Sequence, residues 1–313
     1  MLFDDPKERK MSILLYLLYT CCALLIPGVI AITKAKLSGR KGPGLWQPIY
    51  DILRLLRKGS VYSTTTSYLY QYAPLVNFAA ALLALAFVPL GDVPGLMHFQ
   101  GDFVFFAYLL GLGKFLLILN AMDTGSGFEG MGANREALYS MLVEPAFFIV
   151  MGSMALLSGH NSFVDIFSQF QDTSQYAILL GFLGAYILGQ VAMVENSRLP
   201  VDDPRTHLEL TMVHEVMVLD NSGFDFGIIM ITNSLKFGIY AGLLANLMVP
   251  IWLPLGFRLG FALLISVLFG VMVGLLESFR ARNKMARNPQ FILTLSAVSL
   301  LFFFTVMIIA NRI

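Results

Sequence analysis

Eight apolar segments, each close to the length of a membrane-spanning helix, constrain this chain more than any other feature. A bilayer core requires about 20 apolar residues per helix. The segments lie near residues 11–33, 73–96, 103–121, 138–158, 176–196, 226–250, 256–277 and 291–310. Hydrophobic residues make up 57% of the chain and charged residues only 13%, which is typical of a polytopic membrane protein. The gaps are too short for a soluble domain, so we predict an all-α fold in which residues 1–313 form a single transmembrane domain with about eight helices.

The first apolar segment is expected to stay in place as an anchor, because it is longer than the apolar core of a signal peptide and no small-residue cleavage site follows it. Lysine and arginine are concentrated in the connections after the first and seventh segments and are absent from residues 91–102 and 159–175. By the positive-inside rule the basic connections face the cytoplasm. We therefore predict a multi-pass protein of the cell inner (cytoplasmic) membrane with both termini outside, against a weak opposing signal from Lys7, Arg9 and Lys10.

Several kinds of chemistry are disfavoured by the sequence. Cys21 and Cys22, the two cysteines, are adjacent and do not supply the thiolates of an iron–sulfur cluster or a paired-cysteine metal site. His214 precedes a glutamate as in a zinc-protease motif, but Val218 stands where the second histidine is needed. The glycine-rich residues 123–132 lack the ending of a phosphate-binding loop. A net charge of +1 gives no nucleic-acid footprint. We predict that the chain itself binds no metal, redox cofactor or nucleic acid.

The most polar part of the chain is the connection between the fifth and sixth segments, residues 195–223. Charged groups beside a bilayer are costly, so they usually face a bundle interior, a water-filled cavity or a partner protein. Helix capping by Asp203 before Pro204, and by Thr206, explains part of the pattern. Capping does not explain the remaining ionisable residues, which do not share one helical face. We favour ion movement or docking over a solvated helix for the set His207, Glu209, His214, Glu215 and Asp220.

Four ionisable residues are expected within or beside the membrane-spanning helices. Glu144 stands about seven residues into the fourth segment, hence about 10 Å below its end at 1.5 Å per residue, and Glu136 stands about two turns earlier. Lys114 and Lys236 supply cations in the third and sixth segments. Buried carboxylates and lysines that exchange protons predict a proton path; structural ion pairs, or lysines that reach the headgroups, are the alternative. Pro145 predicts a kinked and hydrated helix next to Glu144.

Residues 45–58 combine isoleucines and leucines with three basic residues at helical spacing. This pattern predicts an amphipathic helix lying on the cytoplasmic membrane surface. The helix would serve either as an anchor or as a gate to a cavity, and the sequence favours neither.

Four motifs in order carry a family resemblance that covers the whole chain. They are residues 39–51, which begin Gly-Arg-Lys-Gly-Pro-Gly-Leu-Trp-Gln-Pro; residues 123–136, which begin Asp-Thr-Gly-Ser-Gly-Phe-Glu-Gly; Leu-Val-Glu-Pro at 142–145; and the polar block 195–223. Together they resemble the membrane subunit shared by complex I, where it is subunit 1, and the energy-converting membrane-bound [NiFe] hydrogenases. The first and third motifs resemble the formate hydrogenlyase (subunit 4) and hydrogenase branch more than quinone-reducing complex I.

The resemblance implies a subunit that anchors hydrogenase-like large and small (iron–sulfur) subunits to the bilayer beside antiporter-like membrane subunits. Those partners would carry the [NiFe] centre and the iron–sulfur clusters, and this subunit would link their redox chemistry to proton or sodium translocation. The acidic positions of the family match Glu136, Glu144, Glu195, Asp202, Asp203, Glu209 and Glu215, to which the cation pattern adds Lys114 and Lys236. The surface facing the peripheral subunits is expected to include Arg40, Gly42, Pro43, Gln47, Asp51, Arg135, Arg198, His207, His214 and Asp220.

Two other functions stay open at the level of sequence. One is a true complex I subunit whose cavity binds quinone. The other is a stand-alone proton-coupled carrier, which is disfavoured because the two halves of the chain show no internal repeat and the acidic residues gather at one face.

Overall fold

The computed structural model describes residues 6–90, 93–172, 177–203, 212–249 and 254–310. Helices dominate these ranges, and the β-structure found in them is one isolated bridge between Leu90 and Val93. The helices are α1 (Pro6–Ala23), α2 (Ile26–Leu37), α3 (Gln47–Leu56), α4 (Tyr68–Phe87), α5 (Asp102–Asp123), α6 (Gly127–Ser158), α7 (Phe163–Asp172), α8 (Ala177–Glu195), α9 (His214–Met217), α10 (Gly223–Met248), α11 (Leu255–Phe279) and α12 (Asn288–Ala310), with a 3₁₀ turn at Met285–Arg287.

The predicted polytopic all-α architecture is confirmed. In the described ranges, seven helices are long and apolar enough to cross a bilayer. α1 and α2 together form the first of them, Ser12–Leu37. The remaining expected segment is α8, whose described apolar part, Leu179–Glu195, is shorter. Each of the eight apolar segments therefore overlaps a helix, although several helix ends differ from the expected bounds.

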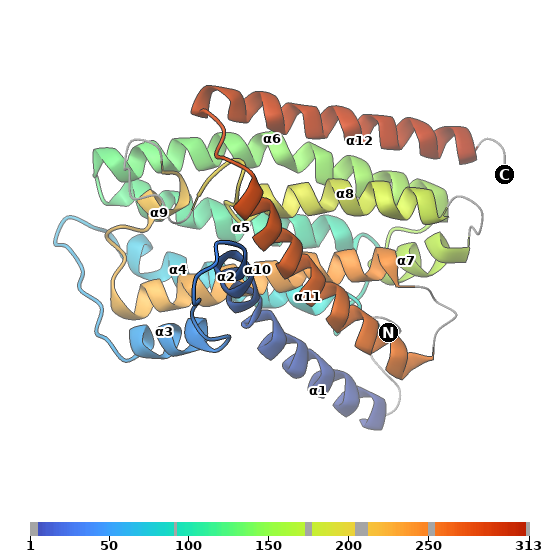
Figure 1. The fold of residues 1–313 in the computed structure, drawn as a ribbon, viewed down its shortest axis with the longest axis horizontal. Coiled ribbons are helices and arrows are strands. Elements are labelled where there is room, and N and C mark those ends of the chain that lie inside the picture. The colour runs from blue at the N-terminus through green and yellow to red at the C-terminus, as the bar shows by residue number, and fades with distance from the viewer. Residues whose placement is uncertain (1–5, 91–92, 173–176, 204–211, 250–253, 311–313) are drawn as a thin grey trace.

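α10 forms the centre of the bundle (Figure 1). In its most apolar window, 83% of the residues are buried inside the protein, compared with 33 to 44% for the other six spans. Glycines allow neighbouring helices to approach it closely: a Cβ atom at Gly242 would lie 3.1 Å from the Tyr19 hydroxyl, and one at Gly227 would lie 3.2 Å from Leu55 and Leu56 of α3. Close backbone approach at small residues is a usual way to pack membrane helices.

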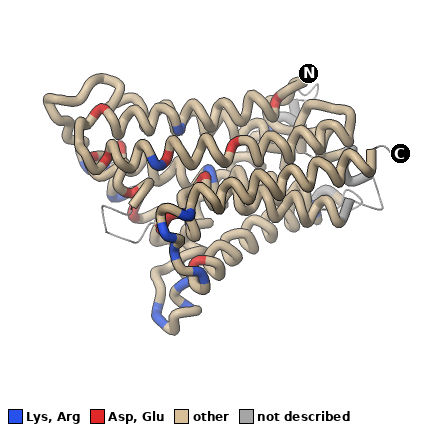
Figure 2. Tube along the Cα trace, turned by 90° about the horizontal axis from the view of Figure 1, so that it is seen from above, with Lys and Arg blue, Asp and Glu red and all other residues tan. Residues whose placement is uncertain are grey.

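The polar connections and the chain ends lie at opposite ends of the bundle. α3, α9 and the start of α6 lie at one end, whereas the start of α1 and the end of α12 lie toward the other (Figure 1). Most of the charged residues gather at the first end (Figure 2). This arrangement agrees with an even number of crossings. The side of the membrane that each end faces stays a prediction from the basic connections.

The amphipathic helix expected near residues 45–58 is present as α3. Ile52 is buried, and Leu55 and Leu56 pack against α10 at Gly227. Trp46 and Tyr50 are exposed on the outer side. At least part of the apolar face of α3 therefore covers another helix of this chain, and its contact with the membrane surface remains a prediction.

α6 differs from the sequence expectation in its length. It begins at Gly127 instead of near residue 138 and continues through Pro145 to Ser158. The early turns are more polar than a membrane span, but Gly132 and Ala133 are buried and these turns pack against α9. Tertiary packing therefore extends the helix, and Glu144 stands seventeen residues after its start, not about seven.

The contact between α6 and α9 gives a stability prediction. A Cβ atom at Gly132 would clash with the Val216 side chain and lie 2.9 Å from the Val213 carbonyl oxygen. We expect Gly132→Ala to destabilise the protein by about 1–3 kcal/mol, the usual cost of overpacking. Gly130→Ala is the matched control, because a Cβ there meets nothing within 4 Å and removing a helical glycine stabilises by about 0.5–1 kcal/mol. Thermal unfolding in detergent measures both, and an equal effect of the two substitutions would contradict the packing explanation.

Candidate functional site

A buried ion triad lies at the junction of α5, α6 and α8. Lys114 Nζ is 2.9 Å from Glu136 Oε1 and 2.9 Å from Glu195 Oε2. The side chains of the three residues are 8%, 5% and 13% exposed, respectively. Buried charges are tolerated only when they are paired and hydrogen-bonded. Three residues far apart in the sequence therefore form one electrostatic unit, which carries two carboxylates for one ammonium group.

A small polar pocket adjoins the triad. Its volume is about 10 Å³, and it is lined by Lys114, Leu117, Glu136, Glu195, Asn196, Ser197, His214, Asn233 and Lys236. The Ser197 hydroxyl lies 3.4 Å from Glu136 Oε2, and Asn196 Oδ1 is buried without a partner in the described protein. This volume is about that needed for one ordered water, which requires two to four polar partners. The lining supplies them, so the pocket is suited to a single bound water.

A larger cavity opens from the other side of the triad. It has a volume of about 260 Å³ and lies among α5, α6, α8 and α10. Glu144 lines it together with Tyr240, Lys114 and Glu195. The Glu144 carboxylate lies close to Gly111 of α5, where a Cβ atom would be 3.4 Å from Oε1. Lys114 and Glu195 therefore line both this cavity and the small polar pocket.

A third cavity, of about 150 Å³, lies between α2, α3 and α10. Its wall is largely apolar and includes Pro27, Pro48, Ile52, Val218, Phe226, Ile229, Met230 and Phe237. Five polar side chains, Arg198, His214, Glu215, Asn233 and Ser234, complete it. His214 and Asn233 also line the small polar pocket, so the three cavities follow one another and each neighbouring pair shares two residues.

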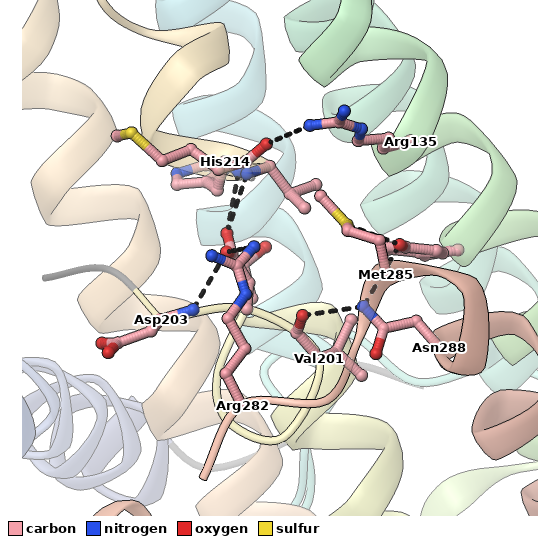
Figure 3. Close-up of polar contacts among 12 residues, drawn as sticks. Arg135, Val201, Asp203, His214, Arg282, Met285 and Asn288 are labelled. Carbon is pink, nitrogen blue, oxygen red and sulfur yellow. Dashed lines mark hydrogen bonds and ion pairs between the residues drawn. The ribbon is translucent and has the colours of Figure 1, made fainter. Parts of the chain in front are cut away.

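Asp202 fixes the two described parts of the polar connection, residues 195–223, to each other, by bonding the backbones of Asp203 and His214, both labelled in Figure 3. Its Oδ2 accepts hydrogen bonds from the backbone N–H groups of Val213 and His214, at 3.2 and 3.0 Å. Its Oδ1 accepts from the backbone of Asp203 and pairs with Arg282 at 2.9 Å. Burial raises the pKa of this carboxyl, while the backbone N–H of His214 and the charge of Arg282 lower it.

A second anchor joins the connection to α2 and α11. The Glu277 side chain is fully buried and pairs with Arg198 at 3.3 Å and with Lys34 at 2.7 Å. The Arg198 guanidinium also lies 4.9 Å from the centre of the Phe237 ring, within the range of a cation–π contact. The start of the connection is therefore held by α11 and α10.

His214 lies between the small polar pocket and the 150 Å³ cavity. Its ring Nε2 is 2.9 Å from Asn233 Nδ2. The pKa of the imidazole is lowered to about 4, chiefly by desolvation; the nearby charges of Lys236, Lys114 and Arg198 also lower it, whereas Glu136 raises it. The histidine is therefore neutral at physiological pH and retains one donor and one acceptor nitrogen.

The low pKa of His214 predicts how stability depends on pH. Between the ordinary pKa of 6.5 and the folded value of about 4, the unfolded chain binds a proton that the folded chain does not. Acidification from pH 7 to pH 5 is therefore expected to destabilise the native protein, and His214→Gln should remove this contribution. Thermal midpoints at the two pH values measure it, with His160→Gln at an exposed site as the control. An unchanged pH dependence in His214→Gln would contradict this assignment.

The other residues expected from the sequence occupy several different places. Glu215 lines the 150 Å³ cavity, and Asp203 is half-buried beside Asp202. Arg135 donates from Nη1 to the Met212 carbonyl oxygen at 2.9 Å, which supports the connection from α6 (Figure 3). Exposed positions are Arg40, Gly42, Pro43 and Asp220, whereas Gln47 and Asp51 are half-buried and hydrogen-bonded to each other. His207 and Glu209 lie outside the described residues.

Sequence reasoning missed the residues that hold the connection in place. They are Lys34, Glu277, Arg282, Asn233 and Asn288, whose Nδ2 donates to the Val201 carbonyl oxygen at 2.9 Å. One signal was available, because Glu277 is the one carboxylate in the strongly apolar span Phe257–Phe279. The roles of the other four depend on contacts across the fold, which no local pattern reveals. Within the described ranges, no cluster of three or more His, Cys, Asp or Glu residues is placed to hold a metal ion.

Known proteins are similar to this chain in sequence and in fold. The chain is 28% identical over 186 residues to hydrogenase-4 component C of Escherichia coli, which covers 59% of each chain. It is 27% identical over 214 residues to formate hydrogenlyase subunit 4 of Escherichia coli, covering 68% of this chain and 69% of the relative. An NADH-quinone oxidoreductase subunit of Thermomicrobium roseum is 29% identical over 220 residues, covering 63% of this chain and 62% of the relative. The chain thus spans less than two thirds of the length of some of these relatives.

A solved structure confirms the similarity of fold. A chain of the archaeal membrane-bound sulfane sulfur reductase superposes with a TM-score of 0.80 at 19% identity, covering 94% of this chain and 98% of that one. The family model described as NADH dehydrogenase matches residues 10–310. The chain therefore belongs to the NADH dehydrogenase family of membrane subunits, that of complex I subunit 1, as its four motifs predicted.

Proposed function

We propose that this chain is the membrane-anchor and coupling subunit of a multisubunit, complex I-like oxidoreductase of the [NiFe]-hydrogenase type. It would link redox chemistry in peripheral subunits to proton translocation. The observation that carries the proposal is the series of three cavities, which share Lys114 and Glu195 on one side of the small polar pocket and His214 and Asn233 on the other. Together they form a route from the loop end of the bundle to Glu144, within α6, with ionisable side chains where the cavities meet.

The lining of the small polar pocket favours protons over sodium as the coupled ion. Its volume of about 10 Å³ is about that needed for one ordered water, and Lys114 and Lys236 both line it. A metal cation prefers a shell of oxygen ligands and is repelled by neighbouring ammonium groups. Protons, in contrast, move between a water, a carboxylate and an amine without needing such a shell.

The polar connection is suited to transmit the redox event. Electron transfer would take place in the hydrogenase-like large and small subunits, whose [NiFe] and iron–sulfur groups lie outside this chain. A change of charge or conformation at their interface with residues 195–223 would reach the triad through Glu195, where the connection begins. Asp202 and Arg198, through their ion pairs with Arg282 and Glu277, hold the connection rigidly. A displacement at the interface would therefore move Glu195 instead of being lost in loop motion. Protons displaced toward Glu144 would then pass to antiporter-like neighbours.

The test of the proposed function is purification of the intact complex through a tag on this chain, in mild detergent, with mass spectrometry and metal analysis. We expect nickel, iron and a hydrogenase-like large subunit to co-purify. Iron without nickel, together with bound quinone, would transfer the assignment to a complex I. Recovery of the chain alone, with solute transport after reconstitution, would replace both by a stand-alone carrier.

The 150 Å³ cavity is the observation that favours the quinone alternative. Its wall is apolar, and its polar side chains include His214 and Arg198, which are able to hydrogen-bond a quinone carbonyl. Narrowing it with Ile229→Phe is expected to raise the quinone KM of a quinone reductase by about tenfold, the cost of losing part of a binding pocket's contacts. The same substitution should leave a hydrogenase-type complex unaffected in dye-dependent activity. Steady-state kinetics of the purified complex with a short-chain quinone separates the two cases.

A further inference from the structure

His214 is the point at which the 150 Å³ cavity meets the buried ion triad. The residue lines that cavity and also the small polar pocket, and Asn233 is its partner in both. The charged groups that face it come from several elements: Glu136 on α6, Lys236 on α10, Lys114 on α5 and Arg198 in the polar connection. His214 therefore lies between the largely apolar 150 Å³ cavity and the charged residues around the small polar pocket.

The position of the ring does not depend on the ring itself. The backbone N–H of His214 donates to Asp202 Oδ2, and Asp202 is held by Arg282. Val216 and Met217, in the same short helix α9, are fully buried against α6. Replacing the imidazole should thus leave α9 in place, so a purely structural role for the ring is separable from a chemical one.

We propose that His214 is the proton-relay residue through which protons pass between the 150 Å³ cavity and the Lys114–Glu136–Glu195 triad. This inference rests on the proposed function and specifies the residue that controls entry to the route. In the relay, one ring nitrogen accepts a proton from a water on the cavity side while the other nitrogen releases its proton to the water or carboxylate on the triad side. The ring is neutral before and after the step, and a ring flip or a second transfer restores the starting tautomer.

The surroundings of His214 suit a relay that does not store charge. Because the imidazole is desolvated and three cations lie near it, the imidazolium is short-lived and the proton moves onward. The Nδ2 amide group of Asn233 donates to ring Nε2, and a 180° rotation of the amide would present Oδ1 as an acceptor for the other tautomer. A carboxylate partner would instead hold the histidine in its charged form and stop the relay.

Chemical rescue tests the proposal in the complete complex. His214→Ala leaves space beside the 150 Å³ cavity, through which added imidazole is able to reach the pocket. In inverted membrane vesicles we expect H₂-driven proton uptake, followed with a pH-sensitive dye, to fall by about tenfold or more, in line with the usual contribution of a positioned acid–base group. Imidazole in the millimolar range should restore it, and H₂-dependent reduction of a soluble viologen should stay near the wild-type rate.

Two further variants keep the test decisive. His214→Gln keeps a side chain able to bond Asn233 but cannot relay a proton through a ring, so it should be as impaired as His214→Ala and should not respond to imidazole at a filled site. His160→Ala, at an exposed position in the connection before α7, is the matched control and should behave as wild type. Wild-type proton uptake in His214→Gln, or a loss in His214→Ala that imidazole does not restore, would overturn the proposal.

The Glu144→Gln variant distinguishes failure of this inference from failure of the proposed function. If Glu144→Gln blocks proton uptake while both His214 variants keep it, the route exists and the relay residue is wrong. If Glu144→Gln also translocates at the wild-type rate, the coupling function itself is wrong.

Discussion

Replacing Glu144 with glutamine is expected to abolish ion translocation while leaving the redox activity of the peripheral subunits in place. Glu144 lines the 260 Å³ cavity between α5 and α6, which is the last of the three cavities counted from the loop end of the bundle. Glutamine keeps the size and hydrogen-bonding capacity of the side chain but cannot carry a proton. Under the proposed function, proton uptake into inverted vesicles should fall to background, whereas H₂-dependent reduction of a soluble dye should change by less than about twofold, because electron transfer is proposed to take place in other subunits.

The matched control for this experiment is Asp165→Asn in α7. Asp165 is a half-buried carboxylate outside the three cavities, so its amide variant should translocate as the wild type does. Translocation at the wild-type rate in Glu144→Gln would remove Glu144 from the path. Parallel loss of dye activity and translocation would instead indicate that the complex fails to assemble, which gel filtration of the tagged complex would reveal.

Replacing Lys114 with methionine is expected to have the largest effect on stability. The lysine ammonium group pairs with both Glu136 and Glu195, at 2.9 Å each, and all three side chains are largely buried. Removing one partner of a buried ion pair costs about 3–5 kcal/mol, because the remaining charge is left uncompensated in a low-dielectric interior. Here two carboxylates lose their partner at once. We expect a marked fall in the thermal midpoint of the detergent-solubilised complex and in its yield.

A triple variant shows whether this cost is electrostatic. Lys114→Met combined with Glu136→Gln and Glu195→Gln removes all three charges, and it should recover much of the lost stability while translocation stays absent. Lys36→Met, at an exposed position near the end of α2, is the control and should be close to neutral. If the triple variant were no more stable than Lys114→Met alone, lost packing of the lysine stem would explain the effect better than unpaired charge.

Much of the fold could be predicted from the chain because hydrocarbon imposes strong local rules. A span must be apolar over about 20 residues and must satisfy its own backbone hydrogen bonds, so each helix is visible in its own segment. α3 was visible for a similar reason, since its apolar and basic residues alternate at helical spacing. The start of α6 was not, because residues 127–137 are too polar for a span and become helical by packing on α9.

The candidate site was predicted as a set of residue types, not as a geometry. Glu136, Glu144, Lys114 and Lys236 stood out because ionisable groups are costly near lipid. Their pairing was not visible: Lys114 binds Glu136 and Glu195, whereas Glu144 lines the 260 Å³ cavity beside this triad. Arg198 was expected at the surface facing the peripheral subunits, and the fold uses it to bind Glu277 inside the protein.

The sequence by itself determined that this chain crosses a membrane many times, that its charged residues gather in a few connections, and that its motifs are those of one family. These properties are encoded locally, in apolar length, in composition and in short residue patterns. The tertiary structure alone decided which charges pair, where the cavities lie and that His214 stands between two of them. Those facts depend on side chains from several elements meeting within about 3 Å, the reach of a hydrogen bond, and such distances are set by helix packing across the whole bundle.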